Sequence, residues 1–278
     1  MEKRIIVSGG DEIREILLAG LTPGRRIRME GAGALCAAGD QLFCACDWGD
    51  VIWRLSAQML VPTALFAGGP GVCDLMISRD RQRLYALCGD ADSLLALSAA
   101  SGAPMMVNRV GVNPRALAMD ETGDVIAVAG GECGQTVLLC AHTLNVLRQL
   151  PMPGMVYAVA LRGGTVYSLC LNEALASTLT TVSSGGIRQT LSLAGMPGTL
   201  SLCGEKLLAA THEHLYTISA DGTRVLNVRD AAGRAQRLLH AGGRLMLCDG
   251  LGEALFALGM TSGRWRLVCE HARDAVML

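Results

Sequence analysis

The chain repeats one unit of about 40 residues, and this period restricts its fold more than any other feature of the sequence. The clearest unit contains four short apolar segments separated by turns. These segments are Arg115–Met119, Val125–Ala129, Thr136–Cys140 and Val146–Leu150. Four strands in a unit of this length are typical of a β-propeller blade. The sequence therefore predicts an all-β fold built from such blades.

The second segment of each unit is the most apolar and marks the position of the unit in the chain. The markers begin at Ile5, Leu42, Leu84, Val125, Val166, Leu207 and Leu245. Successive markers lie 37 to 42 residues apart, and a step of similar length leads from the last marker around the termini to the first. We therefore predict a seven-bladed β-propeller of four-stranded blades.

The two ends of the chain are expected to complete one blade together. The N-terminus starts directly on a second strand, whereas Arg273–Leu278 has the pattern of a first strand without a blade of its own. Pairing the N- and C-terminal strands in one blade closes the ring and removes the free edges of an open sheet. We expect a single domain covering residues 1–278.

Composition narrows the function and the location. Hydrophobic residues make up 51% of the chain and charged residues 18%, which supplies a large core and excludes a disordered protein. The formal net charge of −1 argues against general binding to nucleic acid. The eleven cysteines lie mostly within apolar segments, as expected of buried thiols in a reducing compartment. No signal peptide or membrane span is recognised, so we expect a cytoplasmic protein.

We thus expect a monomeric protein that binds neither a membrane nor nucleic acid.

The units resemble the YVTN-type seven-bladed propeller repeats. The resemblance is carried by VNPRALAMDETGDVIAVAG and by GVCDLMISRDRQRLYALCGDADSLLALSAASG, which have the Gly/Pro entry, the apolar first strand, the Asp/Gly turn and the second strand of that pattern. The repeats are degenerate, because the final Asn of the pattern is replaced by Cys88, Ala129, Cys170 and Thr211. This resemblance implies the propeller fold and does not specify an activity.

The loops that join second to third strands are expected at one end of the propeller, together with the loops that connect successive blades. All seven of these second-to-third loops contain a carboxylate, and none contains Lys or Arg. We call them the acidic loops. Their carboxylates are Asp11, Glu12, Asp47, Asp50, Asp90, Asp92, Glu132, Glu173, Glu213, Asp249 and Glu253. They either attract a cationic ligand or a basic protein partner, or serve as ordinary turn formers that keep the protein soluble.

A second candidate site lies at the expected mouth of the central channel, where the first strands begin. Its residues are Asp74, Arg115, Tyr157, Thr199, Arg237 and Asp274. Mixed charges beside a tyrosine suit a pocket for a polar ligand. The alternative is a ring of ion pairs that satisfy one another.

Metal sites and catalytic motifs are poorly represented in the sequence. His212 and His214 have the spacing that places two imidazoles on one side of an extended segment, but no third zinc ligand is identifiable. We therefore predict no metal site and no cofactor. The motifs of serine hydrolases, P-loop nucleotide binding and zinc proteases are absent.

Two functions fit these observations. The first is a non-enzymatic binding protein or interaction scaffold that uses the acidic loops and the channel mouth. The second is a hydrolase that resembles the propeller lactonases, with carboxylates and histidines at the channel mouth holding a metal or activating water. The absence of a recognisable nucleophile or base favours the first.

Overall fold

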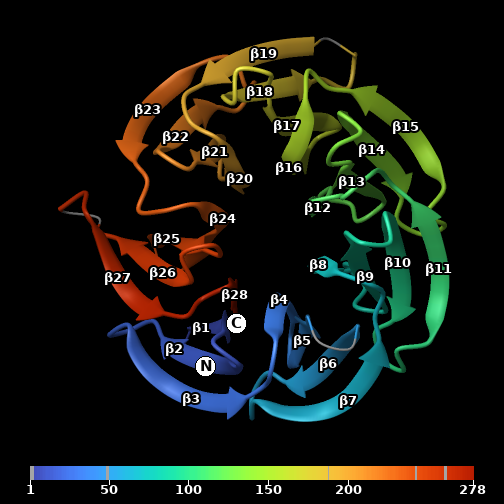
Figure 1. The fold of residues 1–278 in the computed structure, drawn as a ribbon, viewed down its shortest axis with the longest axis vertical. Coiled ribbons are helices and arrows are strands. Elements are labelled where there is room, and N and C mark those ends of the chain that lie inside the picture. The colour runs from blue at the N-terminus through green and yellow to red at the C-terminus, as the bar shows by residue number, and fades with distance from the viewer. Residues whose placement is uncertain (1–2, 48–49, 187, 242, 260–261) are drawn as a thin grey trace. The chain divides into compact units, whose positions relative to one another are not determined.

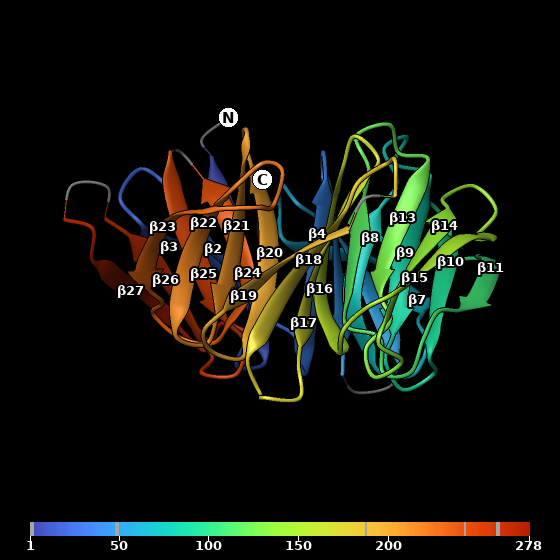
Figure 2. The same ribbon diagram turned by 90° about the horizontal axis from the view of Figure 1, so that it is seen from above.

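The fold is the predicted seven-bladed β-propeller. The computed structural model describes residues 3–47, 50–186, 188–241, 243–259 and 262–278. Within these ranges, twenty-eight strands form seven four-stranded sheets (Figure 1, Figure 2). The described residues include no helix, and hence no helix that could cross a membrane.

Each sheet is one blade, and the strands are numbered in chain order. Blade 1 comprises β28 (Asp274–Met277), β1 (Arg4–Gly9), β2 (Glu12–Leu17) and β3 (Thr22–Arg28). Blade 2 comprises β4 (Ala32–Ala38), β5 (Gln41–Cys46), β6 (Val51–Ser56) and β7 (Val61–Ala67). Blade 3 comprises β8 (Val72–Ile77), β9 (Arg83–Cys88), β10 (Ser93–Ser98) and β11 (Pro104–Arg109).

The remaining blades have the same strand order. Blade 4 comprises β12 (Ala116–Met119), β13 (Val125–Ala129), β14 (Gln135–Cys140) and β15 (Val146–Pro151). Blade 5 comprises β16 (Met155–Arg162), β17 (Thr165–Leu171), β18 (Ser177–Val182) and β19 (Arg188–Leu193). Blade 6 comprises β20 (Pro197–Cys203), β21 (Lys206–Thr211), β22 (His214–Ser219) and β23 (Val225–Asp230). Blade 7 comprises β24 (Ala235–Ala241), β25 (Arg244–Asp249), β26 (Ala254–Leu258) and β27 (Trp265–Glu270).

The chain divides into two compact units. Unit 1 consists of Met1–Ala86, Leu97–Pro104 and Ala232–Leu278, and unit 2 of Leu87–Ala96 and Met105–Ala231. Blades 1, 2 and 7 belong to unit 1 and blades 4, 5 and 6 to unit 2, while blade 3 contributes residues to both. The expectation of one domain for residues 1–278 stays a prediction.

Both chain ends contribute to blade 1, as predicted. β28 pairs antiparallel with β1, so that Ile5 lies opposite Met277 and Ser8 opposite Asp274. The C-terminus accordingly lies beside β1 (Figure 1). The backbone bond from Leu278 N to Arg4 O continues this ladder by one residue. Pairing between the first and last strands leaves the blade with the full four strands.

The second strands form the core because neighbouring blades cover both of their faces. In unit 1, Ile5 and Val7 of β1 pack with Met246 of β25, while Ile6 packs with Leu42 of β5 on the other face. The isoleucines are fully buried. Each contributes about 1.5 to 3 kcal/mol through removal of its apolar surface from water.

The same arrangement recurs in unit 2. Leu169 of β17 packs with Leu207 of β21, and Ala129 of β13 packs with Cys170 of β17. Most side chains between these blades are aliphatic, in keeping with an aromatic content of only 4%, and Tyr167 and Tyr216 join them between blades 5 and 6. Packing between these blades therefore depends mainly on aliphatic contacts.

The fourth strands lie at the exposed outer edges of the blades, and six of the seven carry an arginine. These arginines include Arg26, Arg28, Arg109, Arg148, Arg188, Arg229 and Arg266. Charge on an edge strand discourages unwanted pairing with other chains.

A buried carboxylate joins the edge of blade 1 to its interior. The side chain of Glu15 on β2 is 5% exposed. Arg4 donates from Nη1 to Glu15 Oε1 at 2.6 Å, and the backbone N–H of Arg25 donates to Oε2 at 3.1 Å. Arg4 also donates from Nη2 to the carbonyl of Ala57 in blade 2. Burial raises the pKa of Glu15, but the hydrogen bonds from Arg25 and Arg4 outweigh it and lower the pKa to about 2.

We predict that Glu15 makes the stability depend on pH under acidic conditions. The folded pKa of about 2 lies below the ordinary value of 4.5, so the stabilisation is complete above pH 4.5 and is lost as the pH falls toward 2. The decrease in the free energy of unfolding that is attributable to Glu15 is about 3 kcal/mol. Urea unfolding of the wild type and Glu15→Gln between pH 6 and pH 2 measures it. The difference in the free energy of unfolding between the two proteins should shrink with falling pH, and a constant difference would contradict the assignment. Glu205→Gln, on an exposed turn, is the control.

Candidate functional site

The six residues predicted at the channel mouth lie on or beside the first strands of their blades. Asp74, Arg237 and Asp274 belong to unit 1, whereas Arg115, Tyr157 and Thr199 belong to unit 2.

In unit 1, Asp274 and Arg237 form a two-point ion pair. Arg237 on β24 donates from Nε to Asp274 Oδ1 at 2.5 Å and from Nη2 to Oδ2 at 3.0 Å. The Asp274 side chain is 3% exposed, whereas the Arg237 side chain is 31% exposed. Parallel bonds of this kind fix the orientation of both groups.

Two backbone amides complete the surroundings of the Asp274 carboxylate. Leu35 N donates to Oδ2 and Ala275 N donates to Oδ1, each at 2.8 Å. Since Leu35 lies on β4, one carboxylate on β28 contacts both blade 2 and blade 7. Four donors satisfy the buried charge, as a buried carboxylate requires.

Asp74 on β8 is the second carboxylate in contact with Arg237. It accepts a hydrogen bond from Arg237 Nη2 at 3.1 Å and one from its neighbour Leu75 N at 2.9 Å. Burial lowers the pKa of the Arg237 guanidinium, but the charges of Asp274 and Asp74 outweigh this effect and raise it above its ordinary value. Arg237 therefore remains a cation between two carboxylates.

Two cysteine thiols near this cluster stay protonated. Burial, with a further contribution from Asp74, raises the pKa of Cys36. Burial likewise raises the pKa of Cys248, whose thiol donates to the carbonyl oxygen of Ala272 at 3.5 Å. A thiol is a nucleophile only as the thiolate, so these cysteines act here as packing groups.

The hydroxyl of Ser8 adds a contact beneath Asp274. Ser8 on β1 is fully buried and donates to the carbonyl oxygen of Gly33 at 2.5 Å, with the Asp274 carbonyl at 3.4 Å. Ser8 could not be singled out from the sequence, because a lone serine in an apolar strand gives no signal of the loop that it contacts. The Leu35 amide could not be singled out either, since backbone donors have no residue signature.

In unit 2, the predicted channel-mouth residues make a different contact. The guanidinium of Arg115 lies over the ring of Tyr157, with its central carbon 5.5 Å from the ring centroid. This distance is within the range of a cation–π interaction. Thr199 is partly buried on β20. Binding of a ligand by any of the six residues stays a prediction.

The acidic loops lie beside the loops that connect successive blades, as the fold predicts. In unit 1, Asp11 Oδ1 accepts a hydrogen bond from Gly31 N at 3.0 Å. In unit 2, Asp92 Oδ1 accepts one from Asn113 N at 2.9 Å, and Asn113 Nδ2 donates to Glu132 at 3.2 Å. These bonds anchor the two kinds of loop to each other.

Backbone geometry explains several of the acidic residues. Asp11, Asp50 and Asp92 have φ angles of 57°, 51° and 54°, and Glu253 has a φ of 49°. Among residues other than glycine, aspartate and asparagine tolerate this left-handed conformation best. An aspartate at this point of the turn therefore has a local conformational cause that is independent of any ligand.

Other carboxylates of the acidic loops are engaged by neighbouring groups. Asp47 pairs with Arg273. The Asp92 carboxylate lies 3.6 Å from Arg109, Glu12 lies 3.2 Å from Arg14 and Glu253 lies 3.5 Å from His271. Asp249 is buried and accepts a hydrogen bond from Gly252 N at 2.7 Å.

Unit 2 retains a group of exposed carboxylates in successive acidic loops, and we call these residues the unit 2 acidic row. They are Asp90, Glu132, Glu173 and Glu213. None of them forms an ion pair with a lysine or arginine among the residues that the structure describes; the nearest basic group is His214, 3.9 Å from Glu213. Val112, Leu175 and Met196 on the loops of the same end are 43%, 66% and 37% exposed.

His214, one of the two histidines with zinc-like spacing, lies beside an acidic and an aromatic side chain. His214 Nδ1 lies 3.6 Å from Asp230 and its ring meets Tyr216 edge-on at 5.8 Å. Within the described ranges, no three His, Cys, Asp or Glu side chains form a group that could hold a metal ion. The hydrolase alternative is untested by these observations.

Comparisons with known proteins identify structural relatives and no sequence family. A functionally unknown protein from Desulfotomaculum acetoxidans is similar over 100% of this chain and 99% of its own, with a TM-score of 0.82 at 13% identity. The likeness establishes the fold alone. The Kuenenia stuttgartiensis hydrazine synthase matches with a TM-score of 0.72 at 10% identity, covering 95% of this chain and 91% of that one. BamB from Moraxella catarrhalis matches with a TM-score of 0.63 at 11% identity, covering 88% and 78%.

No family model and no curated protein matches the chain. The seven-bladed fold expected from the YVTN-type resemblance is confirmed, but membership of that repeat family stays a prediction.

We predict that Arg237 stabilises the fold mainly by neutralising two carboxylates. Arg237→Met should lower the free energy of unfolding by about 2 to 4 kcal/mol, less than for a fully buried pair because Arg237 is partly exposed. The substitution Asp274→Asn should lower the free energy of unfolding less in the Arg237→Met variant than in the wild type. Urea unfolding measures both effects, with the exposed Arg148→Met as control. Additive costs would show that the two residues act independently.

Proposed function

We propose that the protein is a non-enzymatic binding protein that takes a basic, amphipathic protein segment on the acidic loops of unit 2. The observation that carries the proposal is the unit 2 acidic row, which presents exposed carboxylates from four successive blades without lysine or arginine partners among the described residues. Such a surface concentrates negative potential and attracts cations.

Apolar side chains on the same loops favour a peptide over a simple cation. Val112, Leu175 and Met196 are exposed beside the unit 2 acidic row. A methionine adapts to irregular apolar partners. A segment that alternates basic and apolar residues would use both features.

The unit 1 channel-mouth residues have a structural part in this proposal. Arg237 is held by Asp74 and Asp274, whose oxygens also accept backbone hydrogen bonds. This supports the prediction of mutually satisfied ion pairs for these three residues. A polar ligand at Arg115, Tyr157 and Thr199 remains part of the proposal as a secondary site.

We also propose that the chain is a divergent YVTN-type repeat protein that acts as a cytoplasmic monomer without a nucleic-acid or membrane partner. The cysteines support the reducing compartment, since all eleven are described and all are free thiols.

The proposal predicts salt-dependent binding of a basic peptide. A labelled peptide of alternating lysine and leucine should bind the wild type, as measured by fluorescence anisotropy. Its affinity should fall strongly between about 20 and about 500 mM salt, because salt screens exposed charges. Replacing Asp90→Asn, Glu132→Gln and Glu173→Gln together should weaken binding about 10-fold.

The matched control carries Glu121→Gln and Glu205→Gln, which lie on first-to-second strand turns of unit 2. It should bind as the wild type does. Equal binding by the triple variant, or affinity that is independent of salt, would contradict the proposal.

A further inference from the structure

The outer edge of blade 1 carries a concentration of positive charge that the other outer strands lack. β3 has Arg25, Arg26 and Arg28 and no acidic residue within seven positions. The remaining six fourth strands have at most one arginine each, and two of these also carry an acidic residue. Charged side chains protect an edge strand from unwanted pairing, and β3 has more arginines than any other fourth strand.

Two of the three β3 arginines have no partner within the described part of the chain. Arg25 Nη2 lies 3.3 Å from Glu15 and is neutralised there. Arg26 and Arg28 form no ion pair or side-chain hydrogen bond among the described residues and are exposed. These two cations are available to a ligand.

The register places Arg26 and Arg28 on one face of the sheet. Arg26 lies opposite Arg14, and Arg28 lies opposite Glu12. Ile27, between the two arginines, packs with the core on the blade 2 side. The two arginines therefore project from the other face, about 6.6 Å apart along the strand.

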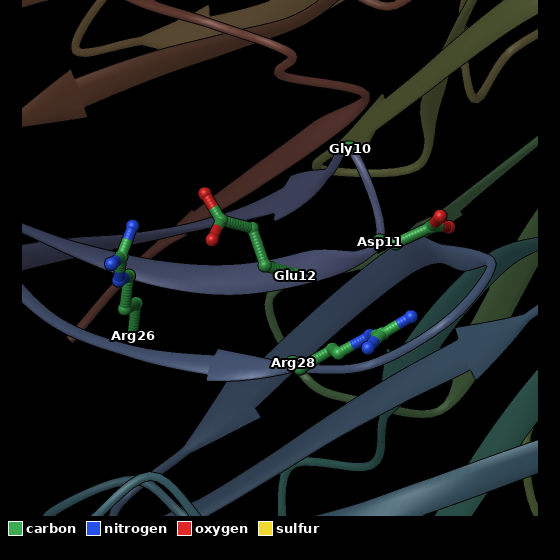
Figure 3. Close-up of a pocket in the computed structure, with 5 residues that line it drawn as sticks. All are labelled: Gly10, Asp11, Glu12, Arg26 and Arg28. Atoms are coloured by element: carbon green, nitrogen blue, oxygen red, sulfur yellow. The ribbon is translucent and has the colours of Figure 1, made fainter.

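A cavity of about 530 Å³ lies between these side chains. It is lined by Gly10, Asp11, Glu12, Arg26 and Arg28. Figure 3 shows the lining side chains, with Glu12 on the side of Arg26 and Asp11 on the side of the Arg28 guanidinium. Both acidic groups are engaged elsewhere, because Asp11 accepts a hydrogen bond from Gly31 N and Glu12 pairs with Arg14.

Arg14 adds a third guanidinium to this face. Its Nε lies 3.2 Å from Glu12 Oε1, and its Nη2 donates to the carbonyl oxygen of His271 at 3.2 Å. Three guanidinium groups and the Glu12 carboxylate share the face, and Asp11 lines the cavity beside them. Arg14 pairs with Glu12, whereas Arg26 and Arg28 form no ion pair among the described residues, and these two cations favour an anionic ligand.

We propose that β3 binds an extended acidic peptide segment by strand addition, with carboxylates at alternate positions facing Arg26 and Arg28. β3 is the terminal strand of its sheet, so part of its backbone has no partner in the blade. Pro23 lacks an N–H and restricts pairing to Gly24–Arg28. An added strand places every second side chain on the arginine face, and each carboxylate can accept paired hydrogen bonds from a guanidinium.

Fluorescence anisotropy with a labelled seven-residue peptide that has glutamate at three alternate positions tests this proposal. We expect saturable binding by the full chain and at least about 10-fold weaker binding by Arg26→Gln/Arg28→Gln. Both variant side chains are exposed, so the thermal unfolding temperature should stay unchanged. The control Arg148→Gln/Arg188→Gln, on β15 and β19, should bind as the wild type does.

Modified peptides separate strand addition from charge attraction. Two peptides are compared, one N-methylated at the odd-numbered residues and one at the even-numbered residues. One of them should lose binding and the other should keep it, because only one set of amides faces β3. A peptide of the same composition with consecutive glutamates should bind more weakly. No saturable binding, equal binding by Arg26→Gln/Arg28→Gln, or equal binding by both N-methylated peptides would overturn the proposal. Tighter Arg26- and Arg28-dependent binding of heparin or duplex DNA would also overturn it in favour of a polyanion site.

Discussion

The carboxylate of Asp274 joins more parts of unit 1 than any other side chain described here. It lies on the strand supplied by the C-terminus, forms a two-point pair with Arg237 of blade 7 and accepts the amide of Leu35 in blade 2. Through Arg237 it is linked to Asp74 in blade 3. A buried charge with this many donors is costly to disturb, because each lost donor leaves part of the charge unsatisfied. The Asp274 carboxylate therefore links the strand that completes blade 1 to the neighbouring blades 2 and 7.

The acidic loops illustrate how one residue type can serve two purposes. Asp11, Asp50 and Asp92 occupy left-handed positions at which the turn itself favours aspartate. Asp47 is paired with Arg273. The functional proposal therefore rests on the unit 2 acidic row, whose exposed carboxylates lack such ion pairs with arginine or lysine among the described residues.

The fold could be predicted from the sequence because its signals are local and repeat seven times. Apolar second strands such as Val125–Ala129 and Arg-bearing fourth strands such as β3 have patterns that a single blade already shows. The pairing of the two chain ends in blade 1 could be predicted because Arg273–Leu278 has the pattern of a first strand without a blade of its own. The repeated period thus supplied both the number of blades and the pairing of the chain ends.

The candidate sites were only partly predictable. Asp74, Arg237 and Asp274 could be selected because each lies at or near the start of a first strand. Their hydrogen bonds depend on the distance between blades, which no residue pattern encodes. The cavity beside Arg26 and Arg28 was missed for the same reason. An arginine on an edge strand is not by itself a sign of a binding site, and only the structure shows that Glu15 pairs with Arg25 and not with Arg26 or Arg28.

The central claim is that the last strand, through Asp274, holds blade 1 and its neighbours together. The most direct measurement compares the free energy of unfolding of the full chain with that of a chain ending at Arg273, with and without an added synthetic peptide of residues 274–278. The account predicts a loss of at least about 4 kcal/mol, from the broken ion pair and the exposed core, and a partial recovery with the peptide. Unchanged stability after the truncation would contradict it.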